Sequence, residues 1–176
     1  MLYELYKEAL QSYEAEDITF VGGSSGGNLA LGMISYINEK EDGLPVPGKV
    51  YAGSPGSLVL TEEEKQKAAT LEKTDVVMSV KAIENIWEGA TGGEAVPDYM
   101  NYLQLGNYTG LKDAYISYGG DEVFAAFADS VKARLKQYGV HVTMEIADGL
   151  YHSYAMMPLV KEAQSGYRNM IAYLSE

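Results

Sequence analysis

One stretch near the N-terminus limits what this chain can fold into, because β-prone residues run directly into a glycine and serine cluster and then into an apolar segment. The sequence there reads Ile18-Thr19-Phe20-Val21-Gly22-Gly23-Ser24-Ser25-Gly26-Gly27-Asn28-Leu29-Ala30. This order predicts a strand, a very tight turn and a helix, with Ser24 in a strained backbone at the C-terminal end of the strand. Glycines two residues before and after Ser24 are expected where strand and helix approach too closely for a β-carbon.

Such a cluster also has plainer interpretations. It is usually only a turn, and a glycine-rich junction between strand and helix can also bind phosphate. The Walker pattern, however, needs a lysine followed by serine or threonine, and G-x-G-x-x-G does not fit residues 22–27. A nucleophilic Ser24 is therefore the hypothesis to weigh against the rest of the chain. The helix that follows would direct its N-terminal N–H groups toward a developing oxyanion.

Size and composition exclude several classes of function. A chain of 176 residues is long enough for one domain with a sizeable core, and its net charge of -12 argues against nucleic acid and anionic membranes as partners. The absence of cysteine excludes disulfides and thiolate chemistry, and two histidines nearly exclude a multi-histidine metal centre. We expect no metal and no cofactor. No apolar run is long enough to cross a membrane and no signal-peptide layout opens the chain, so we expect a cytoplasmic location.

Strands and helices alternate along most of the sequence, which predicts an α/β fold with a mostly parallel sheet covered by helices on both faces. One region differs: residues from about 60 to 105 form a long excursion with two helical patterns and the glycine-rich loop 89–93, typical of a lid-like insert in a single domain spanning 1–176. Its single tryptophan, Trp87, is expected to pack the excursion onto the core rather than to contact substrate. The expected helices are 2–14, 27–40, 62–69, 80–87, 123–138 and 158–174, and the expected strands are 18–21, 49–53, 114–118 and 141–146.

Three polar residues each follow a predicted strand, in the order Ser24, Asp121, His152. Loops at the carboxyl ends of parallel strands converge at one edge of a sheet, so these side chains are expected to meet there. A serine hydroxyl needs a base to take its proton, and the base needs an acid to fix its tautomer. Serine, acid and histidine in this chain order are the order expected for an elbow serine on such a sheet.

Alternatives exist for two of these positions. His141 begins a strand, at the opposite edge of the sheet, and is therefore expected to be structural. Asp121 competes with the adjacent Glu122, which would serve if the turn were rotated, and the other acidic candidates are Asp113, Asp129 and Asp148. Asp121 is the first choice for the acid, and it is also a candidate N-cap of the helix that follows.

These motifs together resemble the α/β-hydrolases of the hormone-sensitive-lipase type, the acetyl-esterase-like carboxylesterases. The family's Gly-Asp-Ser-Ala-Gly-Gly-Asn-Leu-Ala segment corresponds to residues 22–30, its Ser-Pro after the next strand to Ser54-Pro55, and its Gly-x-Asp-Glu stretch to residues 119–122. Its histidine, in a short loop before the last helix, corresponds to His152. The resemblance runs almost from end to end and implies an α/β-hydrolase fold and ester hydrolysis through an acyl-enzyme.

The sequence departs from the family pattern in three places. Gly23 replaces the family's aspartate, Ser25 replaces its alanine, and no His-Gly-Gly-Gly segment precedes the elbow. The resemblance therefore implies an N-terminally truncated fold in which the Ser25 N–H is the expected oxyanion donor. The strand 18–21 would then lie at an edge of the sheet, and an edge with unpaired backbone groups and apolar flanks favours a homo-oligomer.

The leading hypothesis is a serine esterase for small esters, in which Ser24 attacks, His152 moves the proton, Asp121 orients His152 and Ser25 N–H binds the oxyanion. A second hypothesis is a truncated hydrolase-like domain with weak or no turnover, which the missing oxyanion segment favours. A third is a peptidase or amidase that uses the same three residues, since this scaffold hosts several chemistries.

Overall fold

A computed structural model describes residues 1–176, and its core is a sheet of four parallel strands in the order β1-β2-β3-β4. The strands are β1 Thr19–Gly23, β2 Lys49–Gly53, β3 Asp113–Gly119 and β4 His141–Ala147. The helices are α1 Leu2–Ala9, α2 Ser25–Lys40, α3 Glu62–Leu71, α4 Val80–Thr91, α5 Asp98–Asn101, α6 Ala128–Gln137 and α7 Gln164–Ser175, with short 3₁₀ turns at Ala15–Asp17, Leu103–Leu105 and Val123–Phe127.

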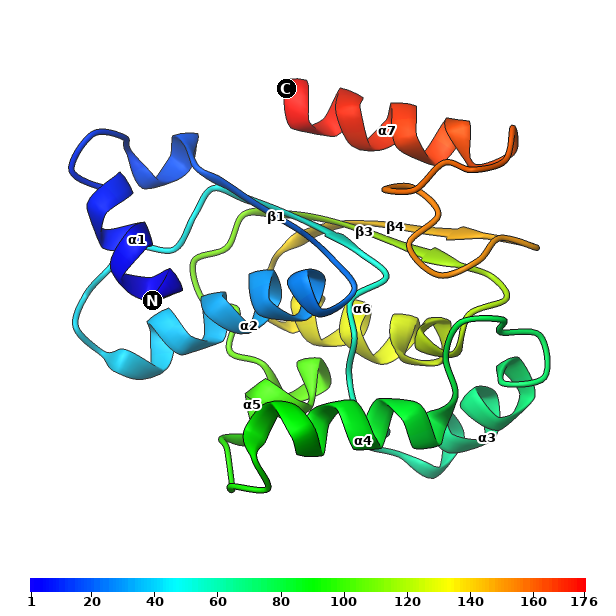
Figure 1. Cartoon of the computed structure of the whole chain (residues 1–176). Helices are drawn as coiled ribbons and strands as arrows, with labels where there is room; N and C mark the ends of the chain where they lie inside the picture. The colour runs from blue at the N-terminus through cyan, green and yellow to red at the C-terminus, as the bar shows by residue number, and fades with distance from the viewer.

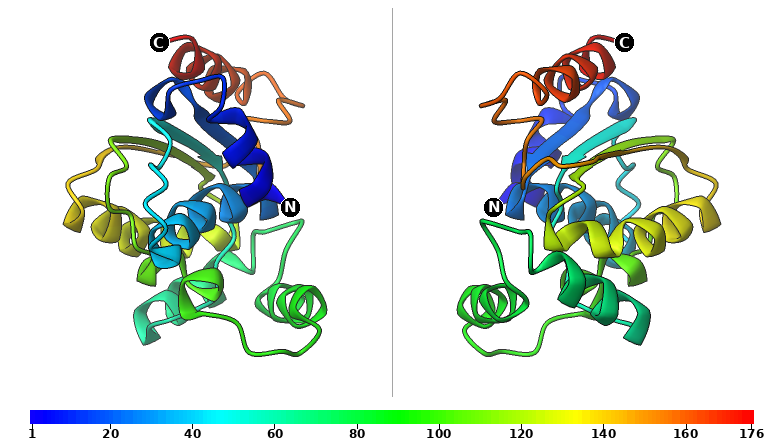
Figure 2. Two further views of the ribbon diagram at one scale, coloured as in Figure 1. Left: turned by 90° about the vertical axis from the view of Figure 1, so that its left-hand side faces the viewer. Right: turned by 90° about the vertical axis from the view of Figure 1, so that its right-hand side faces the viewer.

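The sheet lies between two layers of helix, as expected from the alternation of strands and helices. In Figure 1, α7 lies on one side of the sheet and α2 and α6 lie on the other, and Figure 2 shows the same layers from two sides. In every neighbouring pair the strands run parallel, so all four carboxyl ends share one edge of the sheet. The loops that follow those ends therefore meet, which is the condition for a shared site.

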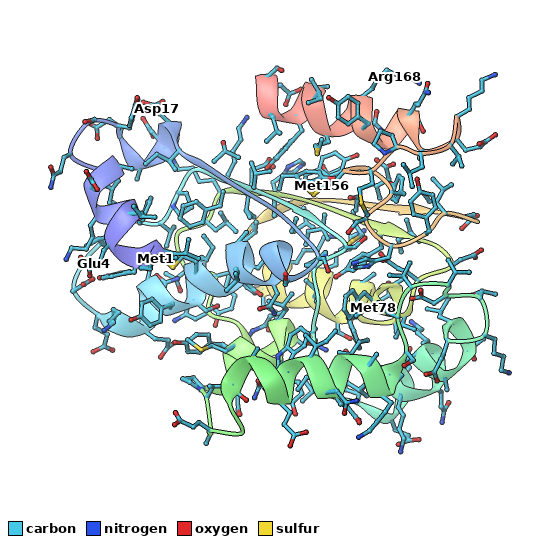
Figure 3. The ribbon with its side chains drawn as sticks, in the orientation of Figure 1. Met1, Glu4, Asp17, Met78, Met156 and Arg168 are labelled. Atoms are coloured by element: carbon cyan, nitrogen blue, oxygen red, sulfur yellow. The ribbon has the colours of Figure 1, made fainter.

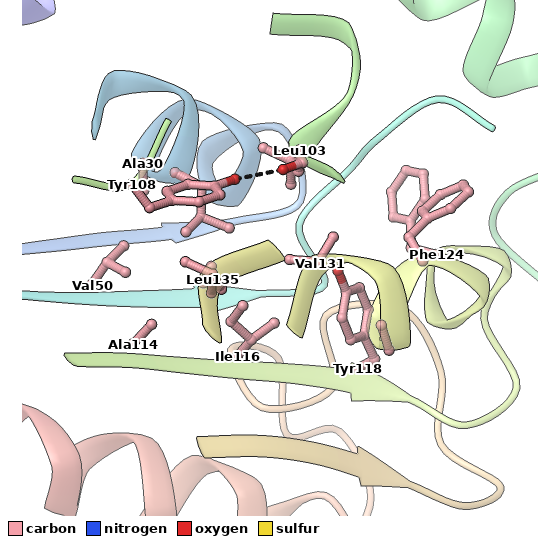
Figure 4. Packing of buried hydrophobic residues seen from close by; sticks show 14 of the residues in the cluster. Ala30, Val50, Leu103, Tyr108, Ala114, Ile116, Tyr118, Phe124, Val131 and Leu135 are labelled. Atoms are coloured by element: carbon pink, nitrogen blue, oxygen red, sulfur yellow. Dashed lines mark hydrogen bonds between the residues drawn. The ribbon is translucent and has the colours of Figure 1, made fainter. Parts of the chain in front are cut away.

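The larger hydrophobic core fills the face under α2 and α6. Twenty-one buried residues form one cluster there, and Leu31, Ile34 and Ile116 in it have no exposed surface. Figure 4 shows this packing, including the buried Tyr108, whose hydroxyl donates to the Leu103 carbonyl at 2.8 Å. Because β-strand side chains alternate between faces, Ala114, Ile116 and Tyr118 of β3 all contribute to this one cluster.

The predicted insert corresponds to α3, α4 and α5 between β2 and β3, and Figure 2 shows α4 at the end of the molecule farthest from α7. Thr61 and Glu64 form a capping box that starts α3. Glu64 is 2% exposed and also accepts from Gln104 at 3.0 Å, and Gln104 accepts from the Ser57 hydroxyl at 2.6 Å. This buried polar chain joins both ends of the insert to the loop after β2.

Several helix boundaries differ from those expected. The first helix ends at Ala9 rather than near residue 14, and α7 begins at Gln164 rather than near residue 158. The segment expected as one helix over 123–138 is a 3₁₀ turn followed by α6. Strand β1 pairs only with β2 and is an edge, as the sequence predicted. None of the helices is both long enough and apolar enough to span a membrane.

Candidate active site

Ser24 occupies a sharp turn between β1 and α2, with φ 54° and ψ -120°. This left-handed conformation is strained for a residue with a side chain, as the sequence pattern predicted. A β-carbon built on Gly22 would lie 2.0 Å from the carbonyl oxygen of Gly26, so only glycine fits at Gly22. The same expectation for Gly26 is wrong, because a β-carbon there would meet nothing within 4 Å. The carbonyl of Gly26 approaches Gly22 closely, but there is space for a side chain on Gly26 itself.

A continuous chain of hydrogen bonds links three side chains from three different loops. The Ser24 hydroxyl lies 2.8 Å from Nε2 of His152, and Nδ1 of His152 lies 2.6 Å from Oε2 of Glu122. His152 is 6% exposed and Glu122 is 1% exposed. The sequence predicts that Ser24 and His152 meet, although they lie 128 positions apart. The structure places the two side chains in contact.

The acid position needs a correction, because the carboxylate on His152 belongs to Glu122 and not to Asp121. Two backbone hydrogen bonds fix the turn after β3: Gly120 N–H donates to the Ala147 carbonyl at 2.7 Å, and Asp121 N–H donates to the Leu150 carbonyl at 3.1 Å. This turn directs the side chain of Glu122 inward, where Oε1 also accepts from the Gly119 N–H at 2.9 Å. Asp121 is not an N-cap either, because Glu122 precedes the 3₁₀ turn at Val123 and makes no side-chain cap.

Burial and hydrogen bonds act on Glu122 in opposite directions. Burial raises the pKa of the Glu122 carboxyl above its ordinary value, because an ion is poorly solvated there. Hydrogen bonds from His152, Ser54 and Gly119 lower that pKa and offset part of the effect of burial. A buried carboxylate that accepts from the Gly119 N–H and contacts His152 Nδ1 is suited to fix the tautomer of the neighbouring imidazole.

The N-terminus of α2 supplies the candidate oxyanion donor. Ser25 is the first residue of this helix, so its N–H has no acceptor within the helix. Gly27 and Asn28 N–H instead donate to the Ser24 carbonyl, at 3.0 and 3.1 Å. The free Ser25 N–H next to the Ser24 hydroxyl therefore stands at the positive end of the helix dipole, where negative charge is stabilised.

Met156 occupies the space that a side chain at position 23, next to Ser24, would need. A β-carbon at Gly23 would lie 2.2 Å from the sulfur of Met156, and one at Gly53 would lie 3.3 Å from it. Figure 3 labels Met156 between the strands and α7, in the chain that leads from β4 to that helix. The thioether thus covers the ends of β1 and β2, where the resembling family carries an aspartate.

The insert approaches the site through its tryptophan. Trp87 packs against the main core cluster, as expected, and a β-carbon at Gly56 would lie 2.8 Å from its ring and 3.2 Å from Phe124. The Phe124 ring in turn meets the His152 imidazole edge to face, with 5.2 Å between ring centres. Trp87 and Phe124 thus lie on the same glycine, Gly56, and Phe124 in turn packs on His152.

The remaining titratable residues named in the sequence lie elsewhere. His141 is exposed at the start of β4 and lies 2.7 Å from Asp113, so it takes no part in the Ser24 cluster. Asp129 pairs with Lys67 at 2.7 Å on the surface, and Asp148 is exposed. No three residues among histidine, aspartate and glutamate gather as metal ligands would.

Two residues of the site had little or no signal in the sequence analysis. Glu122 was an alternative that depended on the rotation of one turn. The sequence marks Ser54 only as part of a Ser-Pro pair, yet it is 1% exposed and its hydroxyl accepts from the Ser153 N–H at 2.8 Å. A serine directly after a buried strand, like Ser24 itself, was the available signal.

Comparisons with known proteins give the family. A model of the alpha/beta hydrolase fold family matches residues 2–156. The chain is 27% identical over 175 residues to the esterase LipU of Mycobacterium tuberculosis, covering 95% of this chain and 57% of LipU. It also superposes on a hormone-sensitive lipase from a metagenome library with a TM-score of 0.83 at 24% identity, covering 97% of this chain and 58% of that one.

A second solved structure, an esterase from the bacterial hormone-sensitive lipase family, matches with a TM-score of 0.78 at 21% identity, covering 91% of this chain and 53% of that one. The chain thus spans somewhat more than half the length of the proteins it matches. The family match covers most of the chain and agrees with the parallel sheet and the Ser24 turn, so the predicted fold is confirmed: the chain belongs to the α/β-hydrolase fold family.

Proposed function

We propose that this chain is a serine hydrolase domain that cleaves small carboxylic esters through an acyl-enzyme. The observation that carries the proposal is the hydrogen-bonded chain from Ser24 through His152 to Glu122, with distances of 2.8 and 2.6 Å. These are the contacts that a serine nucleophile, its base and the acid need. The names of LipU and of the hormone-sensitive lipase, both of which resemble this chain, point to the same chemistry.

In the proposed reaction Ser24 attacks the ester carbonyl while Nε2 of His152 takes the hydroxyl proton. The oxygen of the tetrahedral intermediate accepts from the Ser25 N–H at the start of α2. His152 then returns the proton to the leaving alcohol, and Glu122 stabilises the imidazolium without taking its proton. Water repeats the sequence on the acyl-enzyme, which releases the carboxylic acid and frees Ser24.

Labelling with a fluorophosphonate tests the nucleophile, because this probe reacts only with an activated serine. We expect wild type to be labelled, Ser24→Ala not to be labelled, and the exposed Ser12→Ala to be labelled like wild type. Hydrolysis of p-nitrophenyl acetate by the same proteins tests turnover. Folded wild type that takes no label would contradict the proposal.

Paired variants test the acid assignment. Glu122→Gln should lower kcat/KM for p-nitrophenyl acetate by about 10²–10⁴, because a neutral amide neither selects the correct tautomer nor stabilises the imidazolium. Asp121→Asn should change it by less than about threefold, because Asp121 does not contact His152. The opposite pattern would return the acid role to Asp121.

A second candidate is a hydrolase-like domain that binds ligands without turnover. The observation that favours it is that Ser25 N–H is the single oxyanion donor assigned here, and removal of one donor typically costs about 10²–10³ in rate. Stoichiometric labelling of Ser24 without multiple turnovers of p-nitrophenyl acetate would support this candidate. Faster hydrolysis of aminoacyl amides than of esters would instead favour a peptidase or amidase.

Two further assignments belong to this proposal. We assign residues 60–105 as an insert that faces substrate, because Trp87 of the insert lies against Gly56, as does Phe124, whose ring packs on His152. We also assign the outer edge of β1 as a contact with a second copy of this chain. That edge adjoins an uncharged groove of about 430 Å³ whose lining includes Leu5, Val21 and Leu29, all half-exposed. Sedimentation as a strict monomer at high concentration would contradict the second assignment.

A further inference from the structure

The loop between α3 and α4 brings the insert into contact with the segment that carries Glu122, and Figure 3 labels Met78 in this loop. Asp75 of the loop is half-buried, and its Oδ2 accepts from the Val123 N–H at 2.7 Å. Val123 directly follows Glu122, has no exposed surface and begins the 3₁₀ turn Val123–Phe127. The first N–H groups of a helical turn have no acceptor within it, so Asp75 satisfies a buried donor that the turn itself cannot.

The same carboxylate also shapes the loop of the insert. Its Oδ1 accepts from the Val77 N–H at 2.8 Å and from the Met78 N–H at 2.9 Å. An aspartate that binds backbone N–H groups a few residues ahead closes a local turn. Asp75 therefore has one oxygen on the insert and the other on the segment that carries Glu122. Because the two oxygens belong to one rigid group, the insert loop and that segment move apart only if a hydrogen bond breaks.

The backbone around Glu122 is therefore held on both sides. The Asp121 N–H donates at 3.1 Å to a carbonyl of the loop that carries His152, and the Val123 N–H donates to Asp75. The Glu122 side chain lies between these two anchors and reaches Nδ1 of His152 at 2.6 Å. Its carboxylate lies several bonds from the backbone, so a small rotation of the backbone at either anchor displaces the carboxylate much further. The position of the acid thus depends on a residue of the insert as well as on the sheet.

We propose that Asp75 is a positioning residue, which ties the insert to the Val123 N–H and so holds the Glu122 carboxylate in line with His152. The inference rests on the proposed function of Ser24, His152 and Glu122. Asp75 makes hydrogen bonds to none of these three side chains and acts through the backbone of the residue after Glu122. With this tie, the acid takes its working position only when the insert is seated on the body of the domain.

Asp75 also stabilises the fold, and this effect has to be separated from positioning. Without Asp75 the buried Val123 N–H loses its acceptor, which costs stability whether or not the site is affected. The Thr74 hydroxyl, 3.3 Å from the Asp121 carbonyl, is a second contact that would keep the two segments together. If Asp75 acts through Glu122, its removal changes the reaction only while the Glu122 carboxylate is present. A purely structural role changes the reaction equally with and without that carboxylate.

The test compares Asp75→Ala and Asp75→Asn with Glu72→Ala. Alanine removes both acceptor oxygens, and asparagine keeps the size of the side chain but leaves a single acceptor oxygen, which cannot bind both segments. Glu72 is the matched control, because it lies in the same loop and its carboxylate also accepts a backbone N–H, that of Val80 at 3.1 Å, but that partner belongs to the insert. Circular dichroism first checks that each variant is folded.

The primary measurement is kcat/KM for p-nitrophenyl acetate in two backgrounds, wild type and Glu122→Gln. In wild type, Asp75→Ala should lower kcat/KM about tenfold through kcat, with KM within about twofold of its original value, and Asp75→Asn should lower it about threefold. In Glu122→Gln, both Asp75 variants should change kcat/KM by less than about twofold, because the carboxylate that Asp75 positions is gone. Glu72→Ala should stay within about twofold in both backgrounds. The rate of fluorophosphonate labelling, which needs no turnover, should follow the same pattern.

Three results would overturn the proposal. A folded Asp75→Ala variant that keeps the wild-type kcat would show that the acid does not depend on the insert. Equal losses of kcat/KM in the wild-type and Glu122→Gln backgrounds would assign Asp75 to the fold alone. A loss that appears only as a higher KM would assign Asp75 to substrate binding by the insert.

Hydrogen exchange measured by mass spectrometry separates this proposal from the proposed function, because it needs no activity. Asp75→Ala should speed the exchange of amides in residues 119–127 about tenfold, and Glu72→Ala should not. Wild type that takes no fluorophosphonate label, with faster exchange in Asp75→Ala, contradicts the proposed esterase and leaves the tie through Asp75 standing. Labelled wild type with unchanged exchange in Asp75→Ala contradicts the tie alone.

Discussion

The two faces of the sheet are built from different chemistry. The face under α2 and α6 carries the apolar cluster of 21 buried residues. The face under α7 carries a separate cluster of four buried residues, Tyr51, Tyr115, Met170 and Tyr173, and three of these are tyrosines. Each of these three tyrosine hydroxyls has a partner: Tyr51 contacts Ser117 at 2.8 Å, Tyr115 bonds Glu145, and Tyr173 bonds Asp113 at 2.7 Å.

This difference suggests different tasks for the two faces: the face under α2 and α6 stabilises the fold, and the face under α7 positions side chains. Aliphatic burial is favourable but non-directional, so the α2 and α6 face contributes most of the free energy of folding. Hydrogen bonds are directional, and on the other face they converge on Glu145 of β4, which accepts from Tyr115, Tyr154 and Asn169. Tyr154 lies two residues after His152, so this cluster joins the His152 loop to the sheet and to α7. The next four predictions test that contrast.

The largest loss of stability is expected for Leu31→Ala on α2. Leu31 has no exposed surface and sits in the large cluster, so its truncation removes apolar contacts and leaves a cavity. The free energy of unfolding, measured with urea, should fall by about 3 kcal/mol. The folded fraction should keep kcat/KM within about threefold of wild type. A loss of activity at full folding would contradict the assignment of this face to stability.

Glu145→Gln should have the next largest effect, and its effect should depend on pH. Burial raises the pKa of Glu145, but hydrogen bonds from Tyr115, Tyr154 and Asn169 together bring it below its ordinary 4.5. A lowered pKa in the folded state stabilises the protein above the ordinary carboxyl range, and this contribution is lost as the pH falls through the lowered pKa.

The variant should therefore unfold about 1 kcal/mol more easily at pH 7, a small value because the carboxylate is partly open to solvent. The difference from wild type should shrink as the pH falls below 4.5. Urea titrations at several pH values measure it. A constant difference across that range would show that Glu145 acts by packing and not by charge.

Tyr154→Phe removes one donor to Glu145 and keeps the ring that packs on Gly166 of α7. We expect a loss of somewhat less than 1 kcal/mol in stability. Because Tyr154 holds the His152 loop, kcat/KM should nevertheless fall about tenfold, a larger change than for Leu31→Ala. Equal activities of Tyr154→Phe and Leu31→Ala would contradict the assignment of positioning to the face under α7.

Tyr173→Phe should have the smallest effect. Its hydroxyl lies 2.7 Å from Asp113 and 3.2 Å from the Val50 carbonyl, at the amino-terminal ends of the strands and far along the sheet from the site. Asp113 is only half-buried and also contacts His141, so we expect a loss of about 0.5 kcal/mol and unchanged activity. A fall in the activity of Tyr173→Phe would mean that the hydrogen bonds on the face under α7 are coupled from one end of the strands to the other.

Much of this architecture could be predicted from the sequence because its signals are local. Gly22, Ser24 and the β-prone residues before them determine a turn of one kind, and strands that follow one another in a parallel sheet bring their ends together. His152 could therefore be matched to Ser24 without coordinates.

The choice between Asp121 and Glu122 could not be predicted, because it depends on contacts distant in sequence. The rotation of that turn is determined by the carbonyls of Ala147 and Leu150 in the loop after β4. Glutamate is also one methylene longer, which lets its carboxylate reach back to the Gly119 N–H. The Glu145 cluster has the same origin, since it joins residues of β3, β4, the loop after β4 and α7.

The position of Trp87 has a practical consequence. It is the chain's only tryptophan, and its indole lies against Gly56 and packs on the main core cluster, where α4 meets the body of the molecule. Tryptophan fluorescence, excited selectively over the tyrosines, therefore reports on the place where α4 packs on the core. A red shift of tryptophan emission that precedes the loss of far-ultraviolet ellipticity would show that the packing of α4 on the core is lost before the sheet unfolds.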